Sequence, residues 1–211
     1  MVDGSKWRFD EVVPGAWCLE HGASVKSPPV DSRRCRRILE KAANSGASIA
    51  TFELLRSRGA PIGRRTLHRA IETAVFGHNG SEDPGKDTKE QRESRGEYAR
   101  YMVMIRHLLD VLRLDVNFPD VAPGDMRGRS SAYGTPLCYV VGIGRPDCDA
   151  RELTWLLPDR GADPRPAIIL AKEYDHATFI EHVDRSNTEK GYTDYERYNR
   201  REKSKRICCV Q

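Results

Sequence analysis

The residue types best suited to chemistry stand at the end of the chain, which reads Cys208-Cys209-Val210-Gln211. A prenyl transferase alkylates a cysteine thiolate four residues from a free carboxylate, prefers an aliphatic residue next to last, and uses the terminal side chain to choose the lipid. Cys208 and Val210 meet the first two requirements, and Gln211 favours farnesyl over geranylgeranyl. The pattern therefore predicts farnesylation of Cys208.

Basic residues are concentrated in a ten-residue segment that is separated from this motif by one residue. Positions 197 to 206 hold six basic residues and one acid, a net charge of +5, whereas the whole chain carries +4. The rest of the chain is therefore nearly neutral, which argues against a nucleic-acid-binding domain and for a local electrostatic contact. One lipid chain binds a membrane only reversibly, and each basic residue near an anionic leaflet adds about 1 kcal/mol. The residues expected to contact the anionic membrane are Arg197, Arg200, Arg201, Lys203, Lys205 and Arg206.

The body of the chain lacks the patterns of several other protein classes. No apolar run approaches the roughly 18 residues of a membrane span, and residues 1–10 lack a signal-peptide core, so the body is expected in the cytoplasm. The cysteines form no CxxC pair, and His176 and His182 are too far apart for ligands on one helix. With no nucleophile elbow and no phosphate loop, the sequence predicts no catalytic residue, no metal and no cofactor.

Four segments share an apolar helical stripe that stops at a glycine or at a residue in its place. A left-handed residue after a helix is a common way to end it and to begin an extended segment. The copies cover residues 17–25, 52–62, 105–117 and 153–164, and their stop positions are Gly22, Gly59, Arg113 and Gly161. A second helical signal precedes the later copies, at residues 38–43, 66–70 and 135–139. The repeated unit is therefore a helix pair.

Two of these segments carry a family resemblance. The chain resembles ankyrin repeats at Gly134-Thr135-Pro136-Leu137 and from Leu156-Leu157 to Gly161-Ala162-Asp163. In the first of these, proline can occupy the first helical position without losing a needed hydrogen-bond donor. In that family a unit of about 33 residues opens with T-P-L-H-x-A and closes with L-L-x-x-G-A-D. The resemblance implies an all-α solenoid of four or five stacked helix pairs with long inserted loops. It also implies a concave surface, built from fingers and first helices, that binds a protein partner.

The resemblance divides the chain into three parts. Residues 17–185 form the predicted repeat array, with insertions at about 78–97 and 118–133, the first of which is expected as a mobile loop. Residues 1–16 are a cap or a partial repeat, and residues 186–211 are a flexible basic tail. His68 falls at the family's T-x-H position, where a buried structural histidine is expected. Cys138 replaces that histidine and should weaken its turn, and Pro158 should end or kink its helix.

Three functions stay open on the sequence alone. The first is a non-catalytic interaction scaffold tethered to a cytoplasmic membrane face by a farnesylated tail. The second is a soluble interaction module, cytosolic or nuclear, whose basic tail is unmodified and can be bound by an import receptor. The third is an enzyme with an unrecognised site. The tail also carries Tyr192, Tyr195 and Tyr198, spaced by three, so part of it can either form a free tether or pack against the last repeat.

Overall fold

The computed structural model describes residues 20–21, 24–25, 37–78, 89–120, 134–144 and 150–189, with 77–78, 89–95 and 185–189 described by backbone alone. Within these ranges the chain forms eight α-helices, one π-helical turn and no strand, which confirms the all-α expectation for this part. The helices are α2 (Ile38–Asn44), α3 (Ile49–Ser57), α4 (Thr66–His78), α5 (Lys89–Arg106) with η1 (His107–Val111), α6 (Pro136–Ile143), α7 (Arg151–Asp159), α8 (Arg165–Glu173) and α9 (Ala177–Glu189).

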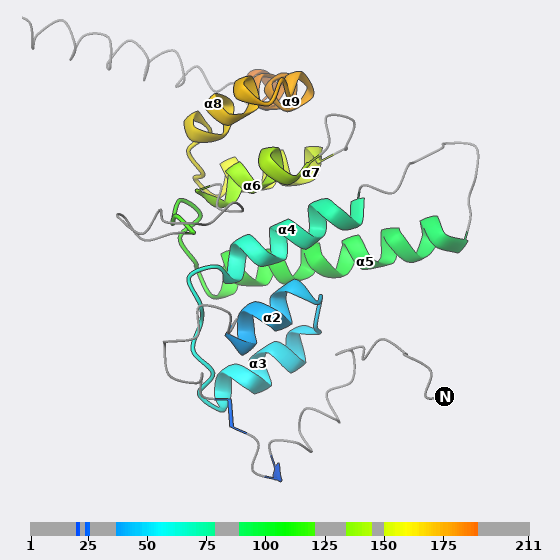
Figure 1. The fold of residues 1–211 in the computed structure, drawn as a ribbon, viewed down its shortest axis with the longest axis vertical. Coiled ribbons are helices and arrows are strands. Elements are labelled where there is room, and N and C mark those ends of the chain that lie inside the picture. The colour runs from blue at the N-terminus through cyan, green and yellow to red at the C-terminus, as the bar shows by residue number, and fades with distance from the viewer. Residues whose placement is uncertain are drawn as a thin grey trace, which may run out of the picture.

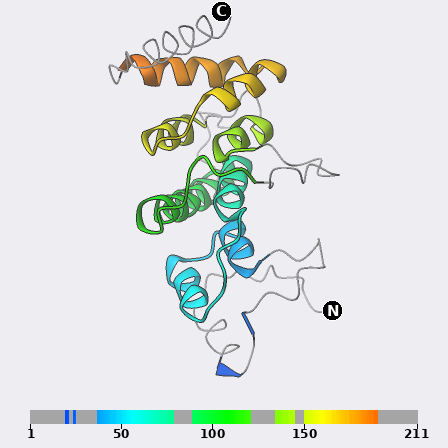
Figure 2. The ribbon, with the colours of Figure 1, turned by 90° about the vertical axis from the view of Figure 1, so that its left-hand side faces the viewer.

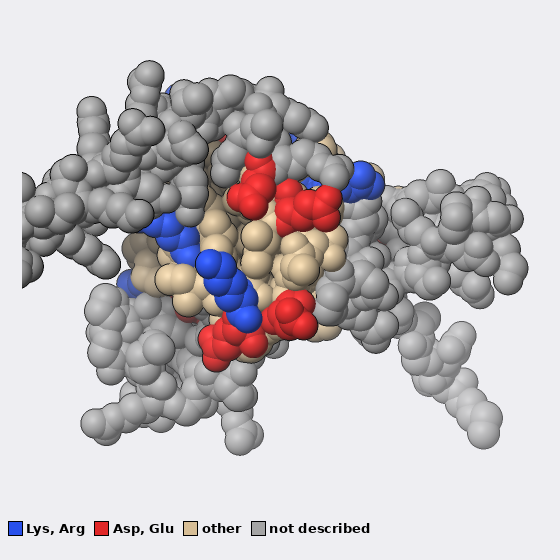
Figure 3. Space-filling model, turned by 90° about the horizontal axis from the view of Figure 1, so that it is seen from above, with Lys and Arg blue, Asp and Glu red and all other residues tan. Residues whose placement is uncertain are grey.

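Successive helices lie in pairs, one pair above another along the long axis of the molecule (Figure 1). The first helices of the pairs form one column, in which α4 contacts both α2 and α6, and α6 contacts α8. The second helices α3, α5, α7 and α9 lie in the other column (Figure 2). Figure 3 looks along the stack onto its α8–α9 end. The connections from one pair to the next gather on the left side of Figure 1.

Four of the helices end in the same hydrogen-bonded turn. The residue after the turn donates its backbone N–H to the carbonyl five positions earlier, and the residue before it is left-handed, as in the Schellman motif. The bonds are Ala47 to Ala42 (3.0 Å), Ala60 to Leu55 (3.1 Å), Ala162 to Leu157 (3.0 Å) and His176 to Ala171 (2.7 Å). The left-handed residues are Gly46, Gly59, Gly161 and Asp175, with φ of 65°, 88°, 88° and 54°. The predicted stop positions Gly59 and Gly161 therefore act as helix caps.

The end of η1 is a longer version of the same closure. Arg113, the third predicted stop position, has φ of 51°, and Leu114 donates its N–H to the carbonyl of Leu108 at 3.0 Å. This bond spans six residues, because the π-helical turn holds one residue more than an α-helical turn. The helix therefore ends where the sequence predicts, although Arg113 has a Cβ and pays a steric cost that glycine does not.

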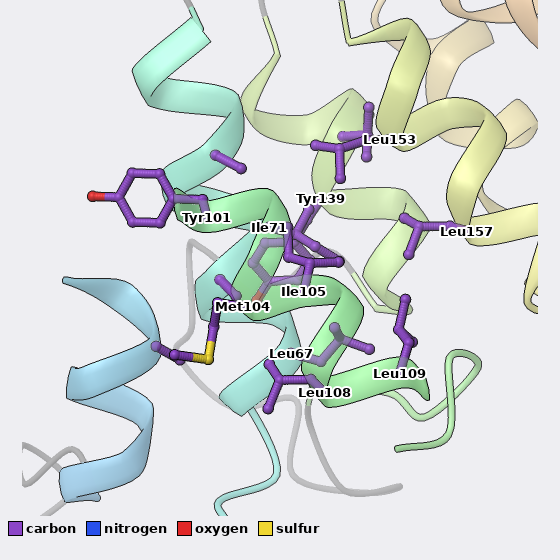
Figure 4. Close-up of a cluster of buried hydrophobic side chains, with 14 of the residues drawn as sticks. Leu67, Ile71, Tyr101, Met104, Ile105, Leu108, Leu109, Tyr139, Leu153 and Leu157 are labelled. Carbon is purple, nitrogen blue, oxygen red and sulfur yellow. The ribbon is translucent and has the colours of Figure 1, made fainter. Parts of the chain in front are cut away.

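The core runs between the columns without interruption. Side chains from α4, α5, η1, α6 and α7 meet in one apolar cluster (Figure 4). Ile71 on α4, Ile105 on α5 and Leu153 on α7 have no exposed surface. Small residues let the helices approach closely, since Ala43, Ala70 and other alanines in the cluster are also fully buried. A narrow core of this kind is expected of a stack in which each pair contacts only its neighbours.

Several predicted boundaries differ from the observed ones. Residues 89–97, expected in a mobile loop, belong to α5, because their lysine, glutamates, glutamine and arginines are good helix formers. Helix α9 continues to Glu189, four residues past the predicted end of the array. Pro158 lies one residue before the end of α7, as its effect on helices predicts. Residues 1–16, 121–133 and 190–211 fall outside the described residues.

Candidate functional site

One position recurs at the start of the first helices, and in α2 and α4 its side chain contacts the turn ahead of the next pair. It is the third residue of each helix, namely Glu40 in α2, His68 in α4, Cys138 in α6 and Ala167 in α8, and all four are buried. Glu40 accepts a hydrogen bond from the backbone N–H of Arg65 at 3.0 Å, just ahead of α4. A Cβ at Gly63 would lie 2.0 Å from this carboxylate, so any side chain there would displace Glu40 from its contact. The position therefore joins one pair to the turn that starts the next.

His68 makes the corresponding contact one pair further along. Its Nε2 lies 3.1 Å from the carbonyl oxygen of Gly134, so this nitrogen carries the proton and donates. Its ring packs edge-on against Tyr139 with centroids 5.1 Å apart. Burial lowers the pKa of His68 from 6.5 to about 4, and the nearby Asp120 carboxylate only partly offsets this. A neutral, buried, hydrogen-bonded histidine is what the sequence predicts at this position.

Cys138 is the weaker member of this row. Its thiol lies 3.3 Å from the Thr135 hydroxyl within its own turn. Burial raises the pKa of the thiol, so it stays protonated and is a poor nucleophile. Thr135 and Pro136 begin α6 as predicted, with Pro136 at the first helical position, and Leu137 is fully buried.

A buried polar network holds residues 112–120, the finger between η1 and α6, against α4 and α6. Arg65 donates to the Tyr139 hydroxyl at 2.7 Å, and this hydroxyl donates to Asp120 at 2.5 Å. The backbone N–H of Asp120 donates to Gly134 at 2.9 Å, on the same carbonyl that His68 contacts. Burial and the bond to Asp120 raise the pKa of Tyr139. Because Tyr139 is fully buried and Asp120 is 2% exposed, the network is a structural connection and has no open substrate site.

At the surface the finger presents an aromatic ring. Phe118 is 39% exposed, and the Arg64 guanidinium lies 4.2 Å from its ring centroid. Arg64 also donates to the carbonyl of Pro119 at 3.3 Å. Asn117 bridges to the next connection, since its amide donates to Gly161 at 2.8 Å and accepts from Asp163 at 2.7 Å. Arg64 ahead of α4 and Phe118 on the finger therefore form a cationic and aromatic surface, and the finger backbone is fixed on both sides.

The second-helix column carries polar contacts between neighbouring pairs. His107 on η1 donates to Glu53 on α3 at 2.7 Å. Arg160 after α7 binds Asp110 through two hydrogen bonds of 2.6 and 3.1 Å, and these bonds lower the pKa of the Asp110 carboxyl. Trp155 on α7 donates to the His182 carbonyl on α9 at 3.2 Å. These contacts align the pairs and leave no convergent set of acid and base groups.

An open hollow of about 490 Å³ lies where α5 extends past the shorter α2–α3 pair. It is lined by residues 46–49, from the turn after α2 to the start of α3, and by Ala99, Arg100 and Val103 of α5. Arg100 is the one titratable side chain among its described lining residues. The hollow therefore lacks the paired polar groups of a catalytic pocket.

No family model, no curated protein and no solved structure matches this chain. In the described ranges no group of three His, Cys, Asp or Glu side chains is placed to hold a metal ion. The helices described here also include none that is long and apolar enough to cross a membrane.

The predicted site residues divide into two sets. Gly59, His68, Thr135, Pro136, Leu137 and Gly161 lie at helix starts, helix ends and the joints between pairs. Gly22, Cys208 and the six basic residues of the tail lie outside the described residues. The sequence interpretation missed Glu40, Arg65, Asp120 and Tyr139. Glu40 has a signal that could have found it, because it is an acid within an otherwise apolar helical face and Gly63 precedes the next helix.

Proposed function

We propose that the chain is a non-catalytic protein–protein interaction scaffold, built as an ankyrin-type stack and held at a cytoplasmic membrane face by farnesylation of Cys208. The main support for a repeat stack is one contact that recurs between pairs. In it, the third residue of a first helix contacts the turn ahead of the next first helix. Glu40 and His68 make this contact in successive pairs, although their side chains differ. Recurring joints with different residues are expected of diverged repeats.

The partner is proposed to bind on the side of the fingers and first helices. Phe118 supports this choice, since aromatic residues and arginine are enriched at the centres of protein interfaces. The network beneath it fixes the finger through Asp120 and Tyr139, so little ordering entropy is lost on binding. By contrast, the second-helix column uses many of its polar groups to join the pairs to one another.

A photoreactive amino acid tests the binding side. It is placed at Phe118 in the finger or, as the matched control, at Val111 on η1, which is 64% exposed. Irradiation in cells should attach another protein to the Phe118 variant and far less of it to the Val111 variant. Equal attachment at both positions, or attachment at Val111 alone, would contradict the proposed binding side.

The tether has its own experiment. In a eukaryotic host the Cys208→Ser variant should move from the membrane fraction to the soluble fraction. Cys209→Ser is the matched control, because it changes the neighbouring thiol and leaves the prenylation pattern intact. If neither substitution changes the distribution, the alternative holds, namely a soluble cytosolic or nuclear interaction module with an unmodified basic tail.

A further inference from the structure

The α8–α9 end of the stack carries a surface that matches the chain's own tail. Ala167 and Ala171 on α8 are fully buried, so Ile169, about 200° around the helix from each, points away from the α6 side. Ile169 is 69% exposed, the largest value among the described large apolar side chains. On α9 an exposed or half-exposed stripe recurs at helical spacing. The end surface consists of Ile169, Lys172 and Glu173 on α8 with Ala177, Ile180, Glu181 and Asp184 on α9.

This end surface is apolar in part and acidic at its edges. Its charged residues are three acids and one base, a net charge of −2. Figure 3 shows carboxylate side chains on both sides of an uncharged area at this end. The opposite charge is found in residues 197–206, which carry +5. Three tyrosines precede or interleave with these basic residues, and their rings are suited to apolar contact with polar tips in water.

The tail begins at this same end. Helix α9 ends at Glu189, and Arg206 follows 17 residues later. A random chain of that length spans about 23 Å, whereas the nine residues of α8 are about 14 Å long. The segment is therefore long enough to cross the whole end surface. Its effective concentration there is in the millimolar range, because it is covalently attached.

We propose that residues 192–206 dock on the end surface, with Tyr192, Tyr195 and Tyr198 against Ile169 and the basic residues beside the carboxylates of α8 and α9. Docking covers the end of the stack as a further pair would. It also engages the charges that the proposed tether offers to an anionic membrane, so the end surface and the membrane compete for one segment. This consequence rests on the proposed function, whereas docking itself requires no lipid.

Zero-length crosslinking of the full, unlipidated chain from bacteria tests the docking. A carbodiimide joins a lysine amine to a carboxylate only when the two are in direct contact. Crosslinks are expected from Lys203 or Lys205 to Glu173, Glu181 or Asp184 within one molecule, with a yield that is independent of protein concentration. Ile169→Ser should lower the yield about fivefold or more, since it removes most of the apolar contact. Val111→Ser, at a similarly exposed position in η1, should leave it unchanged.

Other crosslinking results overturn the docking. Crosslinks that join two copies, with a yield that rises with concentration, assign the end surface to a second copy of the chain. Absence of these crosslinks, or equal yields in both serine variants, shows that the tail does not dock there.

Phosphatidylserine vesicles should lower the yield and phosphatidylcholine vesicles should not. Equal crosslinking yields with the two kinds of vesicle would show that the membrane does not compete with the end surface for the tail. Because Cys208 is unmodified throughout, these outcomes are independent of the farnesylation test.

Discussion

At the scale of residues, the joints between pairs show that one position tolerates different chemistry if its contact is kept. Glu40 and His68 both reach the turn ahead of the next first helix, one as an acceptor and the other as a donor. Each is buried, and an unmet polar group at either place costs about 1–3 kcal/mol. These joints are therefore where single substitutions should have the largest effect on stability.

Acid should weaken the His68 joint. Because the pKa of His68 is lowered from 6.5 to about 4, the unfolded chain takes up the proton first, and the stabilisation present above pH 6.5 is lost as the pH falls toward 4. Between about pH 7.5 and about pH 5 the wild type should lose about 2 kcal/mol more free energy of unfolding than His68→Gln. Urea unfolding at both pH values measures this. Equal losses would show that His68 is not buried and neutral.

Tyr139→Phe should loosen the finger. The substitution removes the hydroxyl that accepts from Arg65 and donates to Asp120, both of which carry charge. The free energy of unfolding should fall by about 1–3 kcal/mol. Hydrogen exchange of residues 112–120 should rise as well, while exchange in α2 stays unchanged. If Tyr139→Phe leaves the free energy of unfolding unchanged, Asp120 is in contact with water and the network is not buried.

Much of the residue-scale picture follows from local patterns, and some of it does not. His68 was identified because its type and its neighbours match a motif. The Arg65, Asp120 and Tyr139 network was missed because its members lie 19 to 74 residues apart, and no local pattern brings such residues together. The helix caps are local, so Gly59 and Gly161 were predicted directly, although Gly46, which caps α2, was not.

At the scale of elements, a matched pair of glycines tests the repeated closure. Gly59 and Gly96 are both exposed, and a Cβ on either would meet no atom within 4 Å. Gly59 is left-handed with φ of 88°, so Gly59→Ala should cost about 1 kcal/mol or more. Gly96 lies inside α5, where alanine should stabilise by up to about 1 kcal/mol. Chemical denaturation of both variants measures the difference, and equal effects would contradict the left-handed cap.

Element ends that depend on distant contacts were harder to predict than the caps. Residues 89–97 have the polar composition of a loop, yet they form the first half of α5. The insertion at 78–97 was inferred from polar composition and from the long spacing between Gly59 and Arg113. Part of that extra length belongs to α5, which has 18 residues, whereas α2 and α3 have 7 and 9. A long helix that extends past a shorter pair is decided by the packing of the pairs and not by local composition.

At the scale of the whole molecule, a stack should unfold locally. Phe179→Ala in α9 should raise hydrogen exchange in α8 and α9 while α2 to α5 keep their protection, because α9 contacts only α7 and α8 extensively. Ile105→Ala in α5 is the central control. Its side chain is equally inaccessible, but it lies where pairs meet on both sides, so exchange should rise through most of the chain. If hydrogen exchange rises through the whole chain in both variants, the protein unfolds as a single cooperative core.

The mass of the C-terminal peptide, from protein purified from a eukaryotic host, decides whether the scaffold is tethered to a membrane through Cys208. The account predicts a peptide that ends at Cys208 and carries a farnesyl group. An unmodified peptide that ends at Gln211 would contradict the tether and leave an unanchored stack.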